Sequence, residues 1–342
     1  MSPAHKLTVE RDGARQRLDR FLTALGTWGT RSQVQRLITH GLVRLDGQPA
    51  KPGAVLRSGQ HIEIEPAPVT VHSDVRPAAI PLEVLYEDAW LLVIDKPAGL
   101  VVHPAPGNWQ DTLVSALLHR WEGRPSDLDP LRPGIVHRLD KDTSGVLLIA
   151  KDAATLADLA RQFHNREVRK EYLALVWGSL RERRGEVAQP IGRHPVHRKR
   201  MSVRAGGRAA VTRFEVVAHN AAASLLRVWP QTGRTHQIRV HLAALGHSIV
   251  GDAVYGAHNA RAAEVGMRRQ ALHAVSLTFQ HPHSGESVCV TAPMPADMQD
   301  AYARLRLSGL TSREPSSSVF ARNAPRPSDS ASRILLGQRS PR

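Results

Sequence analysis

The residues best suited to chemistry lie in one short segment, HRLDKDTSG, at positions 137–145. Asp140 and Asp142 stand between two apolar runs, so a turn could present either carboxylate into a cleft. The flanking cations would keep such a carboxylate ionised and able to act as a nucleophile. The same residue types are common in ordinary turns, where Asp caps the backbone and basic side chains are solvated. The segment alone therefore allows both a catalytic and a structural turn.

A second candidate segment is QTGRTHQIRVHLAALGH, at 231–247. Gly233 precedes a helical pattern whose core-facing residues are expected to be Ile238, Leu242 and Leu245. Arg234 is expected at the helix start, where its charge opposes the helix dipole. A cation in that place indicates a carboxylate or phosphate partner, although a solvated basic face would also explain it.

Metal and nucleotide chemistry find little support in the sequence. The histidines of the second segment, His236, His241 and His247, lack the spacing of zinc hydrolases. With Cys289 as the single cysteine, no Cys-based zinc site can form. The chain also contains no glycine-rich phosphate loop, no GxGxxG and no GxSxG. We therefore expect no metal and no cofactor.

Three further segments could line a cleft. Tyr172 lies in KEYLALVWG, a strand pattern, where a tyrosine is usually a core residue but could stack on a base or relay a proton. The stretch 191–207 is rich in cations, among them Arg198, Lys199 and Arg200, and is typical of a loop that follows an RNA strand. KPAGLVVHP, at 96–104, is either a tight turn beside a cleft or a plain loop.

The charge balance indicates the kind of partner. The 342 residues include 46 Lys and Arg against 31 Asp and Glu, a formal net charge of +15. Such a surplus favours nucleic acid, because cations that bind phosphates release condensed counterions. Solubility or attraction to acidic membranes would be the alternatives. The start of the chain has no apolar secretory region, and no apolar run approaches the ~20 residues that cross a bilayer. We expect a cytoplasmic protein without a membrane partner.

The N-terminal region, residues 17–66, has the pattern of two helices followed by a small sheet, with Asp46-Gly47 as a hairpin turn. It resembles the S4 RNA-binding domain, although a small α/β domain with a solvated basic face needs only the same residues. Its candidate RNA contacts are Arg31, Arg36 and Arg44.

A proline-containing linker at 67–81 leads to the main region, 82–305. Strand-like runs there do not alternate regularly with helices, which predicts an α+β fold with a large mixed, mainly antiparallel sheet. Residues 308–342 are rich in Ser, Arg and Pro, and are expected to form a disordered basic tail.

The candidate segments occur in a recognisable order. LEVLYEDAWLLVIDKPAGLVVHP, PGIVHRLDKDTSGVLLIAK, RKEYLALVWG, QTGRTHQIRVHLAALGHSIVGDAVYG and RQALHAVSLTFQHPHSGE follow one another between about 80 and 295. In this order they closely resemble the RluA family of pseudouridine synthases. The resemblance implies the pseudouridine synthase fold and the isomerisation of uridine in RNA without a cofactor.

The resemblance also implies roles for individual residues. Asp140 matches the family's catalytic aspartate, and Arg138 matches the arginine inserted where the target uridine is flipped out. Tyr172 matches the tyrosine that stacks on the flipped base, and Arg234 matches the arginine that pairs with the aspartate. His137 and Lys141 flank these positions and are candidate RNA contacts.

The S4-like module and the stretch after Ile191 are most similar to the branch of the family that modifies 23S ribosomal RNA at the helix 69 stem-loop. Another 23S site or tRNA is the alternative target. Two other classes compete: a non-catalytic RNA-binding module, and a glycosidase that uses Asp140 and Asp142 as a carboxylate pair. A monomer is expected.

Overall fold

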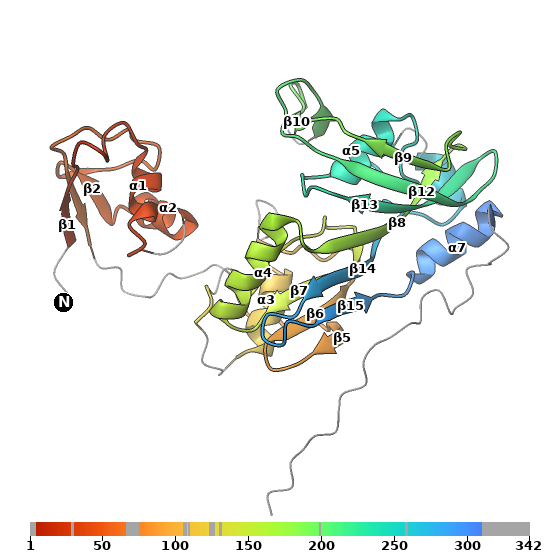
Figure 1. The fold of residues 1–342 in the computed structure, drawn as a ribbon, viewed down its shortest axis with the longest axis horizontal. Helices are drawn as coiled ribbons and strands as arrows, with labels where there is room; N and C mark the ends of the chain where they lie inside the picture. Colours follow the sequence, from red (N-terminus) through yellow and green to blue (C-terminus); the bar gives the residue numbers. More distant parts are fainter. Residues whose placement is uncertain are drawn as a thin grey trace, which may run out of the picture. The chain divides into compact units, whose positions relative to one another are not determined.

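The chain folds into two compact units, Met1–Ser73 and Asp74–Arg342 (Figure 1). The computed structural model describes residues 5–28, 31–65, 75–104, 108, 110–122, 127–129, 132–197, 200–256 and 259–309.

The first unit is a small four-stranded antiparallel sheet with two helices. Its elements are β1 (His5–Thr8), α1 (Leu18–Ala24), α2 (Arg31–Thr39), β2 (Val43–Leu45), β3 (Gln48–Pro49) and β4 (His61–Ile64). The hairpin predicted at Asp46-Gly47 is confirmed, since both residues have positive φ, 51° and 75°, as a type I′ turn requires. Strand β1 lies outside the predicted span 17–66 and pairs with β4.

Apolar side chains at helical spacing hold this unit together. Leu18 and Leu22 of α1 and Val34 and Ile38 of α2 are buried against the sheet. Leu25, which continues the same spacing, is 47 % exposed because α1 ends at Ala24.

The second unit contains the large sheet. Its elements are β5 (Glu83–Glu87), β6 (Leu91–Lys96), α3 (Leu113–Arg120), β7 (Ser144–Ala150), α4 (Ala153–Asn165), β8 (Arg169–Trp177), β9 (Arg184–Val187), β10 (Ile191–Arg193), β11 (Met201–Val203), β12 (Thr212–His219), β13 (Ala223–Pro230), α5 (Gln237–Ala244), α6 (Asn259–Glu264), β14 (Leu272–Gln280), β15 (Ser287–Thr291), α7 (Ala296–Leu305) and β16 (Ser308–Gly309). The strand order is β16-β12-β13-β8-β14-β7-β6-β5, with β15 on β14 and β9 on β12. Within the described ranges only β14 and β7 pair in parallel, so the predicted mixed, mainly antiparallel sheet is confirmed.

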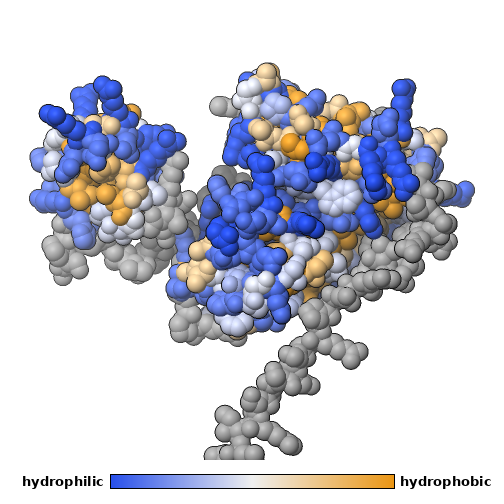
Figure 2. All heavy atoms as spheres, viewed as in Figure 1, coloured by the Kyte–Doolittle hydropathy of each residue, from blue (hydrophilic) through white to orange (hydrophobic). Residues whose placement is uncertain are grey.

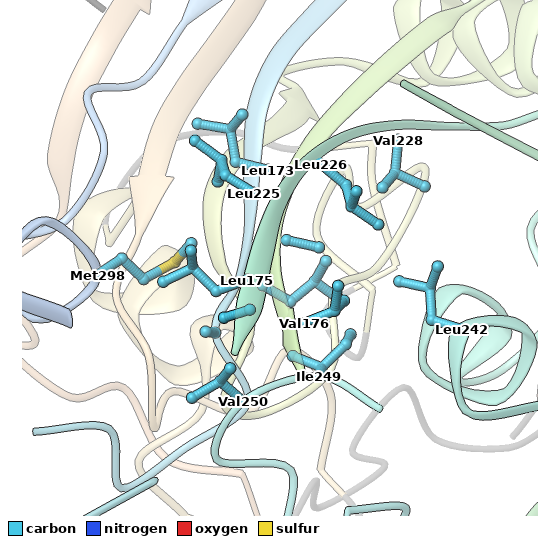
Figure 3. Close-up of a cluster of buried hydrophobic side chains, with 14 of the residues drawn as sticks. Leu173, Leu175, Val176, Leu225, Leu226, Val228, Leu242, Ile249, Val250 and Met298 are labelled. Atoms are coloured by element: carbon cyan, nitrogen blue, oxygen red, sulfur yellow. The ribbon is translucent and has the colours of Figure 1, made fainter. Parts of the chain in front are cut away.

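Both faces of the central strands are covered, which explains the continuous apolar run of β7. Leu147 and Ile149 pack in the cluster that includes α3, while Val146 and Leu148 pack in the cluster that includes α4. A third cluster lies where β8 and β13 meet α5 and α7. Figure 3 shows its side chains, with Leu242 contributed by α5 and Met298 by α7.

The prediction that Leu245 faces the core is wrong, and two other segments also differ from what their local pattern suggests. Residues 134–139 are not a strand, since only Ile135 makes an isolated bridge, to Ile149. Helix α3 is capped by Thr112, whose side chain accepts from the Ser115 N–H, and not begun by Asp111, which has φ 55°. Leu245 is 43 % exposed, because α5 ends one residue before it.

The end of the second unit differs in one detail from the expected tail. Ser308 and Gly309 pair with β12 as β16, so the sheet extends two residues into the span predicted as disordered. The rest of that span, from residue 310, lies outside the described residues. No helix in the described part is long and apolar enough to cross a bilayer.

Gly145, at the start of β7, is expected to be irreplaceable. Its φ is 116°, and a Cβ there would overlap the backbone carbonyl and amide of Ala274 on β14. Gly145→Ala should therefore destabilise the protein by about 2 kcal/mol or more in urea denaturation, because backbone atoms cannot yield as side chains do. Gly246→Ala is the control: its φ is also positive, 84°, but nothing lies within 4 Å. It should cost only about 1 kcal/mol, and equal losses for the two variants would contradict the close-approach argument.

Candidate active site

A cavity of about 1090 Å³ opens in the second unit. It is lined by the segment 136–140, the end of α4, the start of β8, residues around Arg208 and the loop that leads into α5. Five of the residues predicted from sequence line it together: His137, Arg138, Asp140, Tyr172 and Arg234.

The turn that carries Asp140 is held from one side by a buried lysine. Lys96, fully buried at the end of β6, donates to the carbonyls of Pro97 at 2.7 Å, Leu100 at 2.9 Å and Lys141 at 3.0 Å. Burial lowers the pKa of Lys96 to about 8. Its ammonium group therefore ties the turn at 97–100 to the turn after Asp140. The segment 96–104 lines no part of the cavity but supports the turn that carries Asp140 at its edge.

The other side of the same turn is held by the segment before β14. Arg269 donates to the carbonyl of Asp142 at 3.0 Å and is itself paired with Asp297 at 2.7 Å. Gln270 donates to the hydroxyl of Thr143 at 3.3 Å. Anchored on both sides, the turn is a rigid support for the Asp140 carboxylate.

The cation paired with Asp140 is Arg239, and the predicted pairing with Arg234 is wrong. Arg239 is only 5 % exposed, and its Nη1 donates to Oδ2 of Asp140 at 3.0 Å. Its other edge donates twice to the fully buried Asp252, at 2.8 and 2.9 Å. Burial disfavours the charged forms of both Arg239 and Asp252. Hydrogen bonds and Coulombic attraction outweigh this effect, so the pKa of Asp252 is lowered and that of Arg239 is raised. In the described residues, hydrogen bonds reach only Oδ2 of Asp140, so Oδ1 is left for a substrate.

Arg234 lies outside the helix that was expected to begin with it. Helix α5 starts at Gln237 after His236, which has φ 54° and acts as its N-cap residue. The Nε of Arg234 donates to the carbonyl of Ala209 at 3.0 Å, and its backbone N–H donates to Gln237. The correct arginine, five residues further on, could have been found from its place between apolar residues in the helical pattern.

A histidine and a tyrosine complete the surroundings of the ion pair, and sequence reasoning missed the roles of both. Arg239 lies over the ring of Tyr255, 5.1 Å from its centroid. The Tyr255 hydroxyl accepts from the Met201 N–H and is 2.8 Å from Nδ1 of His236, within hydrogen-bond distance. Burial lowers the pKa of His236, whose Nε2 is 3.9 Å from Oδ2 of Asp140.

Tyr172 and His137 form apolar parts of the wall. Burial, and secondly the charge of Asp140, raises the pKa of Tyr172, so the phenol is neutral. His137 stacks on Phe163 at 4.8 Å between centroids, and its Nε2 accepts from the Leu148 N–H at 2.9 Å. Burial lowers the pKa of His137 to about 3, so it carries no charge near neutral pH. Its contact with RNA stays a prediction.

The cavity wall is strongly cationic. Its basic residues are Arg138, Arg166, Arg169, Lys170, Arg208, Arg213, Arg234 and Arg239. Among the described residues, the carboxylates in the lining are Asp140 and Glu171, and Glu171 accepts from the indole of Trp229 at 3.2 Å. Asp142 is not part of the wall, which removes the second carboxylate of the glycosidase alternative. The wall suits a polyanionic substrate.

The remaining predicted contacts lie elsewhere. Lys141 is exposed, with its Nζ 3.4 Å from Oδ1 of Asn108. Arg200 is exposed at the end of the hairpin of β10 and β11, and Arg44 is exposed on β2 of the first unit. Arg198 and Lys199 lie outside the described residues, as do the side chains of Arg31 and Arg36 on α2.

The chain is similar to known proteins over both units. Residues 90–244 match the family model of RNA pseudouridylate synthase, and residues 16–62 match that of the S4 domain. Ribosomal large subunit pseudouridine synthase D of Nitrosomonas europaea is 44 % identical over 305 residues, 88 % of each chain. The protein of that name from Zymomonas mobilis is 42 % identical, covering 90 % of this chain and 99 % of the relative.

Two solved human structures share the fold. RNA pseudouridylate synthase domain containing 1 superposes with a TM-score of 0.52 at 30 % identity, over 63 % of this chain and 84 % of the other. RNA pseudouridylate synthase domain containing 4 gives 0.52 at 26 %, over 66 % and 94 %.

Replacing Lys96 tests its support of the Asp140 turn. Lys96→Met should destabilise the protein by about 1–3 kcal/mol at pH 7, because buried carbonyls lose their donor. The deficit should grow by on the order of 2 kcal/mol between pH 8 and 10.5. In that range the unfolded chain still holds the Lys96 proton and the folded protein has released it, so the wild type alone gains stability as pH rises. Urea denaturation of both proteins at pH 7 and 10 measures this, and a constant deficit would rule out a buried, titrating Lys96.

Proposed function

Because the chain belongs to the RNA pseudouridylate synthase family, we propose that this RNA pseudouridine synthase modifies large-subunit ribosomal RNA, at the helix 69 stem-loop of 23S rRNA. The observation that carries the assignment of the site is the ion pair of Asp140 with the buried Arg239, at the edge of a cationic cavity. The target is supported by the names of the relatives, by the S4 domain and by the net charge of +15.

The target base has to leave its helix before its glycosidic bond can be reached. Arg138 is exposed at the cavity, two residues before Asp140. Its guanidinium can fill the space that the flipped uridine leaves, which offsets part of the unstacking cost.

The reaction breaks the bond between C1′ and N1, rotates the uracil, and joins C1′ to C5, from which a proton leaves. Asp140 acts on the ribose through Oδ1, either by bonding to C1′ or by removing a proton to give a glycal. Arg239 keeps this carboxylate ionised and oriented, with Asp252 holding the guanidinium from behind. The isomerisation changes no oxidation state, so it calls for no cofactor.

Tyr172 holds the detached uracil by stacking. Its raised pKa disfavours the phenolate, so the ring offers a neutral aromatic face beside Asp140. A neutral phenol can also donate a hydrogen bond to a uracil oxygen.

We place the enzyme in the cytoplasm, where ribosomal RNA precursors are available to it, and we expect it to act as a monomer.

Removing the charge of Asp140 should abolish turnover but preserve binding. Asp140→Asn keeps the shape of the side chain, so its affinity for the RNA should stay within a few-fold of wild type. Release of tritium from RNA with 5-tritiated uridine should fall by about 10³-fold or more, the scale expected when a reacting group is lost. Asp142→Asn is the matched control, since Asp142 lies in the same turn but outside the cavity, and should release tritium at a near-normal rate. Normal release by Asp140→Asn would refute the assigned role.

The RNA target is tested in cells that lack the protein. Carbodiimide treatment followed by primer extension maps pseudouridines in ribosomal and transfer RNA. Loss of the helix 69 signals, restored by the wild-type gene and not by Asp140→Asn, is the expected result. Loss at another 23S site or in tRNA would replace the proposed target, and unchanged maps would refute the activity in that organism's RNA.

A further inference from the structure

Arg234 does not pair with the carboxylate that the sequence led us to expect, and Arg166 and Arg208 lie near it. We propose that Arg166, Arg208 and Arg234 together bind one phosphate of the RNA backbone, next to the nucleotide whose base reaches Asp140. This inference rests on the proposed function in one respect, that RNA occupies the cavity.

The three arginines come from distant parts of the chain and meet at the same cavity. Arg166 is the C-cap residue of α4, Arg208 precedes β12, and Arg234 lies between β13 and α5. Arg166 and Arg208 are exposed, and Arg234 is partly buried. Figure 2 shows hydrophilic side chains gathered over α4 and over the region of β9 and β12. A phosphate at the cavity mouth would be accessible to all three elements.

None of the three has an ion-pair partner among the residues that the structure describes. Other arginines near this face do have partners: Arg213 lies 2.7 Å from Glu186, and Arg161 lies 2.7 Å from Asp158. The charges of the unpaired group affect one another, since burial first, and then Arg208 and Arg166, lower the pKa of Arg234. Cations that repel one another without an anion cost free energy, which a bound phosphate would recover.

Arg234 is fixed through its Nε, while its two Nη groups make no hydrogen bond to any residue that the structure describes. Its Nε donates to the backbone carbonyl of Ala209, the residue that follows Arg208, so the bond brings the backbone at Arg208 close to Arg234. Its backbone N–H donates to Gln237, whose amide donates to the Val211 carbonyl at 2.9 Å.

A buried polar network reinforces this loop. Thr232 donates to Gln237 at 2.6 Å, and Gln237 also donates to Thr212 at 2.9 Å. Burying three polar side chains is favourable only when their hydrogen bonds are made, and here they join the loop to the start of β12. The two Nη groups of Arg234 are therefore preorganised for the paired contacts that a guanidinium makes with phosphate.

The test counts phosphate contacts through the salt dependence of binding. The probe is an unmodified synthetic hairpin with the helix 69 sequence, bound by the full chain carrying Asp140→Asn so that no turnover interferes. Arg166→Gly, Arg208→Gln and Arg234→Gln are compared singly and together. Glycine suits position 166 because its φ is 63°, so the first variant removes the cation without backbone strain.

Arg306→Gly is the matched control. Arg306 is the C-cap residue of α7, with φ 51°, is exposed, and does not line the cavity. This variant removes one cation from the same helical position and should leave the affinity and its salt dependence as in the parent protein.

The triple variant should reduce the slope of log Kd against log salt by about one, because a single phosphate is lost, with unchanged thermal unfolding. Each single variant should weaken the affinity roughly 5- to 20-fold and reduce the slope by no more than about one, because the two remaining arginines still contact the phosphate. A reduction of about three in the triple variant would mean three separate phosphates, and an unchanged slope in the triple variant would mean no contact; either overturns the proposal. The salt dependence reports binding to the RNA backbone whether or not the hairpin is modified. Failure of wild-type enzyme to form pseudouridine in it would therefore refute the target alone.

Discussion

One buried guanidinium, that of Arg239, is the interaction on which the rest of the site depends. It is shared by Asp140 and Asp252, so one positive charge stands between two carboxylates. Burying such a group is costly unless its hydrogen bonds are complete. Asp252 meets that condition by also accepting from the backbone N–H groups of Val254 and Tyr255. The result joins α5, the segment after Ile249 and the Asp140 turn into one rigid arrangement, with only Oδ1 of Asp140 available to a substrate.

The sheet supplies the second half of that rigidity. Strands β7 and β14 run parallel where Gly145 meets Ala274, and the Asp140 turn begins just before this contact. Lys96 from β6 and Arg269 from the segment before β14 then hold the carbonyl groups of the turn. A carboxylate carried by this turn needs little rearrangement when charge develops on the sugar, which is how preorganised sites lower a barrier.

The sequence indicated most strands of the large sheet and the Asp140 turn, and it failed where the direction of a side chain decides. The runs that became β8, β12, β13, β14 and β15 were predicted because apolar alternation is a local property. The pairing of Asp140 was assigned to Arg234 and belongs to Arg239. Only the fold shows that His236 adopts a left-handed conformation, so the helix starts later and turns Arg239 inward. Likewise, no local pattern reveals that Lys96 is buried and donates to the carbonyl of Lys141, which is 45 residues away in sequence.

The arginines of the cavity include two groups with different tasks: Arg239 on one side, and Arg166, Arg208 and Arg234 on the other. Arg239 is buried, and its ion-pair partners Asp140 and Asp252 belong to the protein. Its charge is therefore compensated within the fold whether or not RNA is bound. Arg166, Arg208 and Arg234 have no ion-pair partners among the described residues, so their charges remain available to a polyanion. Substitution of Arg239 should thus alter the carboxylate that we propose to react, and substitution of the other three arginines should weaken the attraction of RNA. A site with one carboxylate oxygen uncommitted among the described residues, amid excess positive charge, can attract RNA electrostatically while the Asp140 carboxylate keeps its own charge.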